Sequence, residues 1–175
     1  MEDRRARMGI ENSVNEAPDF CLRLLRENCP EAVLDTLLPQ GDPTAMIRPE
    51  FLSKVIEFLK NEPRLLYNVL IDITAIDYPE RNPRFDVVYQ LLSLPFNRRL
   101  RLKVSVGGAE PVVDSLTPWW GSANWLEREV WDMFGIRFAG HPELKRILLY
   151  EEFQGHPLRK DYPIDKRQPR IGPKV

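Results

Sequence analysis

The stretch Arg99–Val106, with the sequence RLRLKVSV, has the clearest periodicity in this 175-residue chain. Apolar residues alternate with Arg99, Arg101, Lys103 and a serine. Successive side chains on a β-strand point to opposite faces of the sheet. The stretch therefore predicts a strand with one face in a core and a basic face toward solvent or a partner.

Two further strands are predicted before it. Tyr67–Ala75 alternates less cleanly, and Phe85–Leu94 alternates until Pro95 ends it. The connections at residues 79–83 and 95–98 are short enough to make each strand the hairpin neighbour of the one before. We expect a mostly antiparallel sheet.

Helical periodicity precedes the strands. Phe20, Leu24 and Leu25 predict a short helix that ends near Pro30, and the apolar residues of 33–38 predict a second helical stretch. A third helix is expected to open at Pro49 and to end by Pro63, because proline suits the first helical turn. Its apolar stripe consists of Phe51, Leu52, Val55, Ile56 and Leu59.

A further helix is predicted after the strands. Ser122 or Asn124 can cap its start, and Asn124 with Glu127 has the spacing of a capping box. The helix is expected to end at Phe134, because Gly135 follows. The expected core stripe is Leu126, Val130, Met133 and Phe134.

Three charged residues of this helix lead to different expectations. Arg128 and Asp132 are spaced as an exposed i, i+4 pair. Glu129 borders the apolar stripe, so we expect a cation or backbone donors beside it, from this chain or from another.

The order of these elements predicts an α+β fold. We expect a mostly antiparallel sheet packed against helices in a two-layer sandwich, with an extended basic C-terminal tail. The expected boundaries are a flexible extension at residues 1–16, the α+β domain at 17–154 and a partner-binding tail at 155–175. From His156 onward six Lys and Arg face two Asp, with repeated prolines and no periodicity.

Composition excludes several classes of protein. The 25 Lys and Arg balance 26 Asp and Glu, which argues against a surface built wholly for polyphosphate. No run of 18 apolar residues occurs, and the first residues lack the apolar stretch of a secretory signal, so we expect neither a membrane span nor independent export. Cys21 and Cys29 lack the spacing of metal ligands, so no zinc or iron–sulfur site is expected from this chain alone, and both are expected to be helix-face or core thiols.

The two histidines lie in repeated Gly-His-Pro triplets at 140–142 and 155–157. We expect His141 and His156 to serve as capping or turn residues. An acid–base pair of His156 with Asp161, as in a small autonomous enzyme, stays open. A nucleic-acid module that uses Arg99, Arg101, Lys103 and the tail is a further alternative, although no exposed aromatic residues accompany these cations.

The residues from 127 to 163 resemble a known family. Glu127–Ile136 (EREVWDMFGI), His141 and Lys145–Leu148 closely resemble the signature of the 30 kDa subunit of respiratory complex I, the C subunit of the bacterial NADH–quinone oxidoreductase. Gly155–Pro163 (GHPLRKDYP) resembles its C-terminal hallmark. The likeness covers roughly residues 45–165 and also takes in Asp77-Tyr78-Pro79, Arg84-Phe85, Val88-Tyr89 and Leu92-Ser93-Leu94.

This resemblance implies a structural subunit in the peripheral arm of a proton-translocating NADH:quinone oxidoreductase. FMN, iron–sulfur clusters and quinone belong to the assembly, and this chain is expected to bind no cofactor or metal and to have no catalytic residue. The expected partners are the quinone-cavity subunit and the terminal iron–sulfur subunit, with no nucleic acid. The expected location is peripheral, on the cytoplasmic side of a bacterial plasma membrane, with membrane contact only through the complex. A stand-alone subunit, not fused to the quinone-cavity subunit, is expected, because the chain ends at Val175.

The resemblance also implies which residues meet the partners. We expect buried charge pairs with a neighbouring subunit at Glu127, Arg128, Glu129, Asp132, His141, Arg146, His156, Arg159, Lys160 and Asp161. Related chains serve membrane-bound hydrogenases, formate hydrogenlyase and ferredoxin-fed complexes, and this alternative stays open.

Overall fold

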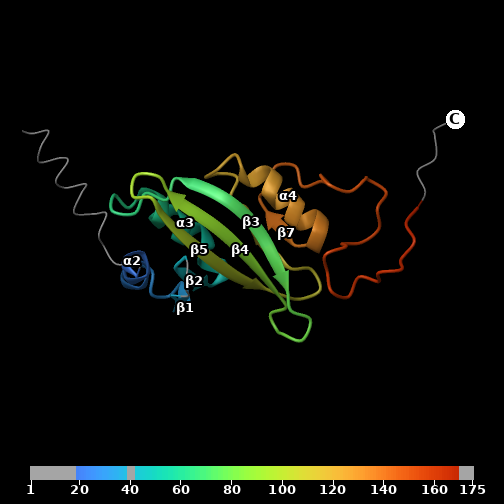
Figure 1. The fold of residues 1–175 in the computed structure, drawn as a ribbon, viewed down its shortest axis with the longest axis horizontal. Coiled ribbons are helices and arrows are strands. Elements are labelled where there is room, and N and C mark those ends of the chain that lie inside the picture. Colours follow the sequence, from blue (N-terminus) through green and yellow to red (C-terminus); the bar gives the residue numbers. More distant parts are fainter. Residues whose placement is uncertain (1–18, 39–41, 170–175) are drawn as a thin grey trace, which may run out of the picture. The chain divides into compact units, whose positions relative to one another are not determined.

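The computed structural model of the chain describes residues 19–38 and 42–169 (Figure 1). The predicted α+β class is confirmed. The elements in chain order are α2 (Phe20–Asn28), β1 (Val33–Leu37), β2 (Thr44–Ile47), the 3₁₀ turn η1 (Pro49–Phe51), α3 (Leu52–Asn61), β3 (Val69–Asp77), β4 (Phe85–Ser93), β5 (Arg98–Val106), β6 (Val112–Asp114), α4 (Ala123–Phe134) and β7 (Arg137–Ala139).

Five strands form one mostly antiparallel sheet in the order β1-β2-β5-β4-β3. β1 pairs antiparallel with β2, and β2 runs parallel to β5. β6 and β7 form a separate parallel pair. The described residues divide into two compact units, the first made of those from 19 to 71 together with 89–104, the second of 72–88 together with 105–169. The boundary between the units falls within strands β3, β4 and β5, so each of these strands has residues in both units.

The first unit has its core around α3. As predicted, Leu52, Val55, Ile56 and Leu59 form its buried stripe, each fully excluded from solvent. Phe51, also predicted in this stripe, lies in η1 and is half-buried. The preceding η1 turn begins at Pro49, because proline needs no hydrogen-bond partner for a missing N–H there. The helix at Phe20–Asn28 is also confirmed, and both cysteines are buried and outside any disulfide.

The predicted helix over residues 33–38 is wrong. Val33–Leu37 is the strand β1, which pairs with β2 through a register shift between Val33 and Asp35. The apolar residues looked helical because a bulge adds a residue and disturbs the alternation of a strand. The strand β2 was also missed, because three of its four residues are buried and a short buried strand shows no alternation.

The alternation of β5 is confirmed. Leu100, Leu102, Val104 and Val106 are buried, while the residues between them are half-buried and Arg99 before them is exposed. The strand therefore has one core face and one basic face, as its sequence predicts.

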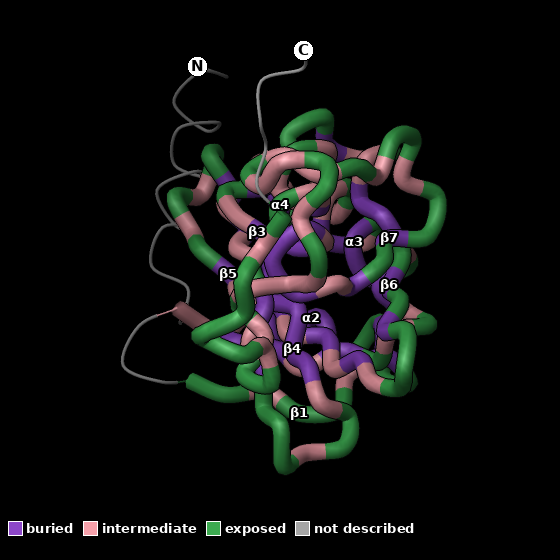
Figure 2. The backbone as a smooth tube through the Cα atoms, turned by 90° about the vertical axis from the view of Figure 1, so that its right-hand side faces the viewer, coloured by how far each residue is buried: buried purple, intermediate pink, exposed green. Residues whose placement is uncertain are grey.

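The second unit contains α4, β6, β7 and the long segment that follows β7. Ser122, not Asn124, precedes α4, and its side chain makes no capping hydrogen bond, so the expected Asn124–Glu127 capping box is wrong. Gly135 ends α4 as predicted, with φ of 76° in the left-handed region that favours glycine. Leu126 is only half-buried, and the carboxylates of Glu127 and Asp132 are buried in addition to Val130, Met133 and Phe134. Figure 2 colours the buried residues of the chain purple.

Candidate functional site

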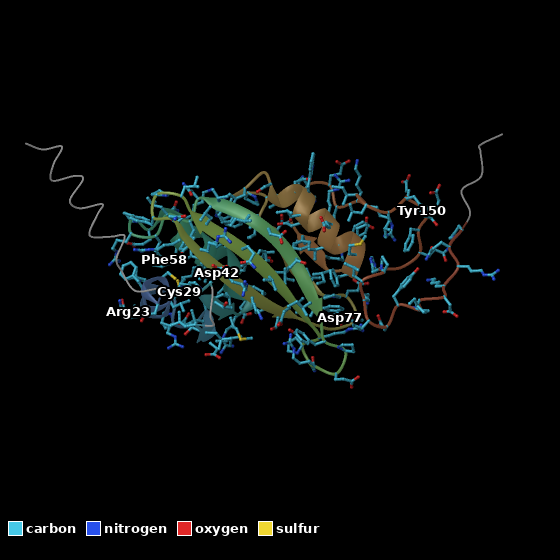
Figure 3. The ribbon with its side chains drawn as sticks, viewed as in Figure 1. Arg23, Cys29, Asp42, Phe58, Asp77 and Tyr150 are labelled. Carbon is cyan, nitrogen blue, oxygen red and sulfur yellow. The ribbon has the colours of Figure 1, made fainter. Side chains whose placement is uncertain are left out.

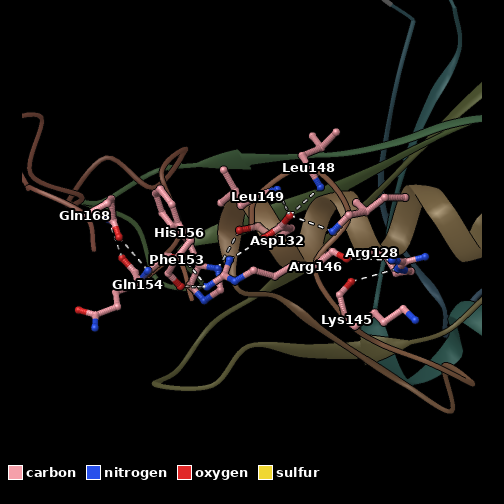
Figure 4. A network of polar contacts seen from close by, with 12 residues as sticks. Arg128, Asp132, Lys145, Arg146, Leu148, Leu149, Phe153, Gln154, His156 and Gln168 are labelled. Atoms are coloured by element: carbon pink, nitrogen blue, oxygen red, sulfur yellow. Dashed lines mark hydrogen bonds and ion pairs between the residues drawn. The ribbon is translucent and has the colours of Figure 1, made fainter. Parts of the chain in front are cut away.

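Asp132 is the centre of a polar network in the second unit (Figure 4). Its Oδ2 accepts three consecutive backbone N–H groups, from Ile147, Leu148 and Leu149, at 3.1, 2.9 and 2.9 Å. Its Oδ1 lies 2.6 Å from Nη1 of Arg146. Burial acts to raise the pKa of Asp132, but these four donors outweigh it and hold the pKa below its ordinary value. The buried carboxylate is therefore charged and fastens residues 146–149 to α4.

Arg146 extends this network to the next turn of the chain. Its Nη2 donates to the carbonyls of Phe153 and Gly155, at 2.7 and 3.2 Å. Its guanidinium also lies 5.8 Å from the ring centroid of Trp131 and 5.6 Å from that of Phe153. One buried ion pair thus organises residues 146–155, and we call residues 143–169 the arm.

The arm also closes the C-terminal end of α4. His156 Nδ1 lies 3.0 Å from the carbonyl of Asp132, and the N–H of Leu158 donates to the carbonyl of Met133 at 3.0 Å. Carbonyls in the last turn of a helix lack partners inside the helix, so the arm supplies them. A Cβ at Gly135 would lie 2.6 Å from Cδ2 of His156, so only glycine admits the ring there. The predicted capping role of His156 is confirmed.

Arg128 contacts the arm and not Asp132. Its Nε and Nη2 donate to the carbonyls of Lys145 and Arg146, at 3.0 and 2.8 Å. The expected exposed Arg128–Asp132 pair is therefore wrong. The i, i+4 spacing alone cannot show that a later segment folds over the helix and takes both side chains.

His141 is a turn residue, as predicted. Its Nδ1 accepts the N–H of Glu143 at 3.0 Å, so Nε2 carries the hydrogen and donates to the carbonyl of Asn124 at 3.0 Å. The ring fixes the turn at which the chain leaves β7.

A second ion-pair network joins three motifs that are far apart in the sequence. Arg84 binds Asp77 with two hydrogen bonds, from Nε at 2.6 Å and from Nη2 at 2.7 Å, and its Nη1 binds Asp161 at 2.8 Å. Asp77, labelled in Figure 3, also accepts the backbone N–H of Lys160 at 2.7 Å. The hydrogen bonds from Arg84 lower the pKa of Asp77 and lower that of Asp161 to about 2. Asp161 is further paired with Arg159 at 3.3 Å.

These contacts change the interpretation of the sequence-predicted residues. Asp132 with Arg146, and Asp161 with Arg84, form charge pairs within the chain. His156 and Asp161 are each engaged elsewhere, so the structure does not assemble them as an acid–base pair. Asp77 and Arg84 were missed as site residues, although the motifs that contain them were part of the resemblance.

Glu127 occupies a separate buried position. Its carboxylate accepts the Ser115 hydroxyl at 2.7 Å and the N–H of Leu116 at 2.6 Å, and its side chain is fully buried. Burial raises the pKa of Glu127 to about 7, more than these two hydrogen bonds lower it. Glu127 therefore connects α4 to the turn before it, and its carboxylate becomes protonated as the pH falls through about 7.

The first prediction concerns this carboxyl group. Because its pKa rises from 4.5 to about 7 on folding, its contribution to stability is fully present below pH 4.5 and is lost as the pH rises through about 7. Against Glu127→Gln, whose amide does not titrate, the free energy of unfolding of the wild type should fall by about 2–3 kcal/mol between these pH values. Urea unfolding of both proteins across this range measures the difference, and a constant difference would contradict the assignment.

Glu129 is exposed, in contrast to its two acidic neighbours. None of the residues in 19–38 and 42–169 pairs with its carboxylate. The expectation of a partner in this chain is therefore wrong for the described part, because the buried positions of α4 are those of Glu127 and Asp132. A partner from another chain remains a prediction.

Large apolar side chains of the second unit also lie in solvent. Trp125 on α4 is 69% exposed, and Leu148, Leu158 and Ile164 of the arm are 60%, 51% and fully exposed. A hollow of about 480 Å³ lies between α4 and the arm, lined by Trp131, Leu144, Lys145, Arg146, Leu149 and Glu151. The ion pairs thus hold an arm from which Leu148, Leu158 and Ile164 face solvent.

The sequence profile of one protein family, described as the respiratory-chain NADH dehydrogenase 30 Kd subunit, matches residues 45–168. The chain belongs to this family. Two relatives, each named as the C subunit of NADH-quinone oxidoreductase, support the assignment. The one from Roseiflexus sp. (strain RS-1) is 47% identical over 143 residues and covers 82% of each chain. The one from Citrifermentans bemidjiense is 44% identical over 150 residues, which is 85% of this chain and 92% of the relative.

Two solved structures are also similar to this chain. A structure titled "Nqo5 of the trypsin-resistant fragment (1-134)" matches with a TM-score of 0.61 and 35% identity, over 70% of this chain and 97% of that chain. A chain in the structure of a membrane-bound sulfane sulfur reductase, an archaeal respiratory membrane complex, matches with a TM-score of 0.71 over 85% and 87% of the two chains. It is only 18% identical, so this second likeness shows the fold alone.

Two further features concern residues 19–38 and 42–169. In these ranges no helix is both long and apolar enough to cross a bilayer. The same ranges contain no group of three or more His, Cys, Asp or Glu side chains placed to hold a metal ion.

Proposed function

We propose that this chain is the C subunit of a proton-translocating NADH:quinone oxidoreductase and that it serves there as a structural component without redox chemistry of its own. FMN, the iron–sulfur clusters and quinone are assigned to other subunits. The proposed partners are the quinone-cavity subunit and the terminal iron–sulfur subunit, and the proposed location is the cytoplasmic side of a bacterial plasma membrane. Family membership and the relatives that bear this name support the proposal.

The observation that carries the structural role is that the signature contains both internal ion pairs and exposed side chains. The buried carboxylate of Asp132 pairs with Arg146 of the same chain, and this pair holds the arm in place. Three apolar side chains of the arm are exposed and do not belong to the core of the second unit: Leu148, Leu158 and Ile164. Three large exposed apolar side chains on one segment support the proposal that the arm faces a partner.

Most of the ten signature residues are thereby proposed to act on partners indirectly. Glu127, Arg128, Asp132, His141, Arg146, His156, Arg159 and Asp161 position the turn before α4 and the arm. Glu129 and the side chain of Lys160 face solvent and are proposed to touch a partner directly. Holding a docking segment in one geometry lowers the conformational entropy that association has to overcome.

The experiment that tests the function is purification of the tagged chain from gently solubilised membranes of its native host. Recovery of a large assembly that contains flavin and iron and reduces quinone with NADH is expected. Activity with hydrogen, formate or reduced ferredoxin in place of NADH would move the chain to one of the related complexes. Recovery of the chain alone would contradict the proposal.

A second prediction separates direct contacts from positioning. Glu129→Ala is expected to leave the melting temperature of the isolated chain unchanged, because the side chain is exposed, and to lower the yield of the complex severalfold, because a carboxylate at the interface is lost. The matched control is Glu143→Ala, whose exposed carboxylate pairs with Lys145, two residues away. Equal yields of complex for wild type and Glu129→Ala would remove Glu129 from the interface.

A further inference from the structure

The outer face of α4 carries an aromatic ring and a carboxylate side by side. Trp125 is 69% exposed, and Glu129, four residues later, is exposed as well. Residues four apart on a helix are surface neighbours, with about 5–6 Å between their Cβ atoms. Helical side chains lean toward the N-terminal end of the helix, so the carboxylate of Glu129 inclines toward the turn that carries Trp125. We call these two side chains the ring–carboxylate pair.

The other charged residues of α4 are engaged within the chain. Glu127 and Asp132 accept hydrogen bonds from donors of the second unit, and Arg128 donates to two carbonyls of the arm (Figure 4). In the ranges 19–38 and 42–169, no residue pairs with the carboxylate of Glu129, and no cation or second ring contacts the ring of Trp125. The helix therefore presents to solvent a carboxylate without a counter-charge, one turn from an exposed indole.

Elsewhere in the second unit, arginine side chains join a ring to a carboxylate. In each case the guanidinium lies over the ring and its N–H groups bind the carboxylate. Examples are Arg81 with Tyr78 and Asp86, Arg84 with Phe85 and Asp77, and Arg146 with Trp131 and Asp132. The guanidinium carbons lie 4.3, 4.9 and 5.8 Å from these ring centroids, within the range of a cation–π contact. The ring–carboxylate pair has two of the three parts of this arrangement and lacks the arginine.

The chemistry of the pair selects an arginine above other side chains. A guanidinium is planar, so its face can stack on the indole of Trp125 while N–H groups at its edge bind the carboxylate of Glu129. The ammonium of lysine is a compact, strongly hydrated charge that does not stack in this way. An apolar side chain over the pair would take water from the carboxylate without replacing its hydrogen bonds, which is unfavourable.

We propose that Trp125 and Glu129 together bind an arginine of a partner subunit, whose guanidinium stacks on the indole and donates to the carboxylate. Tryptophan and arginine are enriched among the residues that dominate the binding energy of protein interfaces. This inference rests on the proposed function, because the arginine has to come from another subunit of the assembly.

The test uses the full-length chain in the complex isolated from its native host. Ser122 is exposed, lies three residues before Trp125 and makes no capping hydrogen bond with its side chain. Its replacement with the photo-cross-linking residue p-benzoylphenylalanine therefore leaves the ring–carboxylate pair in place. Val112, 47% exposed on β6, receives the same replacement as a control. Irradiation should link position 122, and not position 112, to a segment of another subunit that contains an arginine.

Substitutions in the cross-linking chain then test the two contacts. Trp125→Leu keeps an apolar side chain but removes the ring, and Glu129→Gln keeps the shape but removes the charge. Each should lower the yield of cross-linked product per complex about fivefold. Glu143→Gln is the matched control, because the exposed carboxylate of Glu143 pairs with Lys145 and should not affect the yield. When the arginine of the linked segment is replaced with alanine, Trp125→Leu and Glu129→Gln should no longer lower the yield.

The other outcomes are distinguishable. An intact complex in which position 122 links to a segment without arginine, to residues 1–18 or 170–175, to a second copy or to nothing would overturn the inference and leave the proposed function standing. An undiminished effect of Trp125→Leu after loss of the partner arginine would also overturn it, because the ring would then act on something else. A wild-type chain that does not purify with the complex would overturn the proposed function and this inference together.

Discussion

Asp132→Ala is expected to release the arm from α4 and to lower the free energy of unfolding by about 3–5 kcal/mol. The substitution leaves the guanidinium of Arg146 without its carboxylate and deprives three consecutive N–H groups, at residues 147–149, of their acceptor. Buried donors that lose an acceptor cost more than a surface ion pair that is broken. Urea unfolding and hydrogen exchange of residues 146–149 measure the two effects.

Glu129→Ala is the matched control, since it removes a carboxylate from the same helix at an exposed position. A loss of less than about 1 kcal/mol in Asp132→Ala would contradict the assignment. The pH dependence gives a second check. The pKa of Asp132 is lower in the folded chain than its ordinary value of 3.8, so the ionised carboxylate stabilises the fold at pH values above 3.8. This stabilisation is lost as the pH falls through the lower pKa of the folded chain. Asp132→Ala should lack this part of the acid sensitivity.

Arg84→Leu is expected to have the next largest effect, about 3 kcal/mol or more of lost stability. Arg84 is the shared cation of Asp77 and Asp161, and Asp77 is fully buried at its side chain. Without the guanidinium, Asp77 keeps only the N–H of Lys160 as a donor from the arm. We expect the pKa of Asp77 to rise and residues 158–162 to detach from β3, measured by urea unfolding and by hydrogen exchange.

Lys160→Ala is the control for this network. Only the backbone N–H of Lys160 binds Asp77, so loss of the side chain should leave stability within about 0.5 kcal/mol of the wild type. A double-mutant cycle of Arg84→Leu with Asp77→Asn should give a coupling energy above about 1 kcal/mol. Additive effects of these two substitutions would show that the pair does not hold the arm.

The sequence predicted the elements whose burial pattern can be read within one segment. The alternation of Arg99–Val106 and the apolar stripe of α3 are confirmed, because each element has one buried face. β1 and β2 were not predicted, since a bulge hides the period of one and burial on both sides hides the period of the other. The parallel pairing of β2 with β5 is a long-range contact that no local pattern contains.

The same distinction applies to the site. The resemblance selected Asp132, Arg146 and Asp161, but it assigned their charges to a neighbouring subunit. Their true partners lie 14 and 77 residues away in the same chain. The helical spacing predicted that Glu129 lies nearer the core than Asp132. This prediction assumed that α4 has one buried face, whereas the arm covers a second face that contains Asp132. The resemblance therefore identified Asp132, Arg146 and Asp161 but not the residues of this chain with which they pair, and it missed Asp77 and Arg84.

Hydrogen exchange of the free chain and of the assembled complex separates the two roles proposed for the arm. If internal ion pairs shape the arm and its outward face meets partner subunits, the amides of residues 147–149 are protected already in the free chain. The amides of Leu158 and Lys160, which donate to Met133 and Asp77, are also protected in the free chain, and residues 163–169 gain protection on assembly. Fast exchange at 147–149 in the free chain, or unchanged exchange at 163–169 on assembly, would contradict these roles.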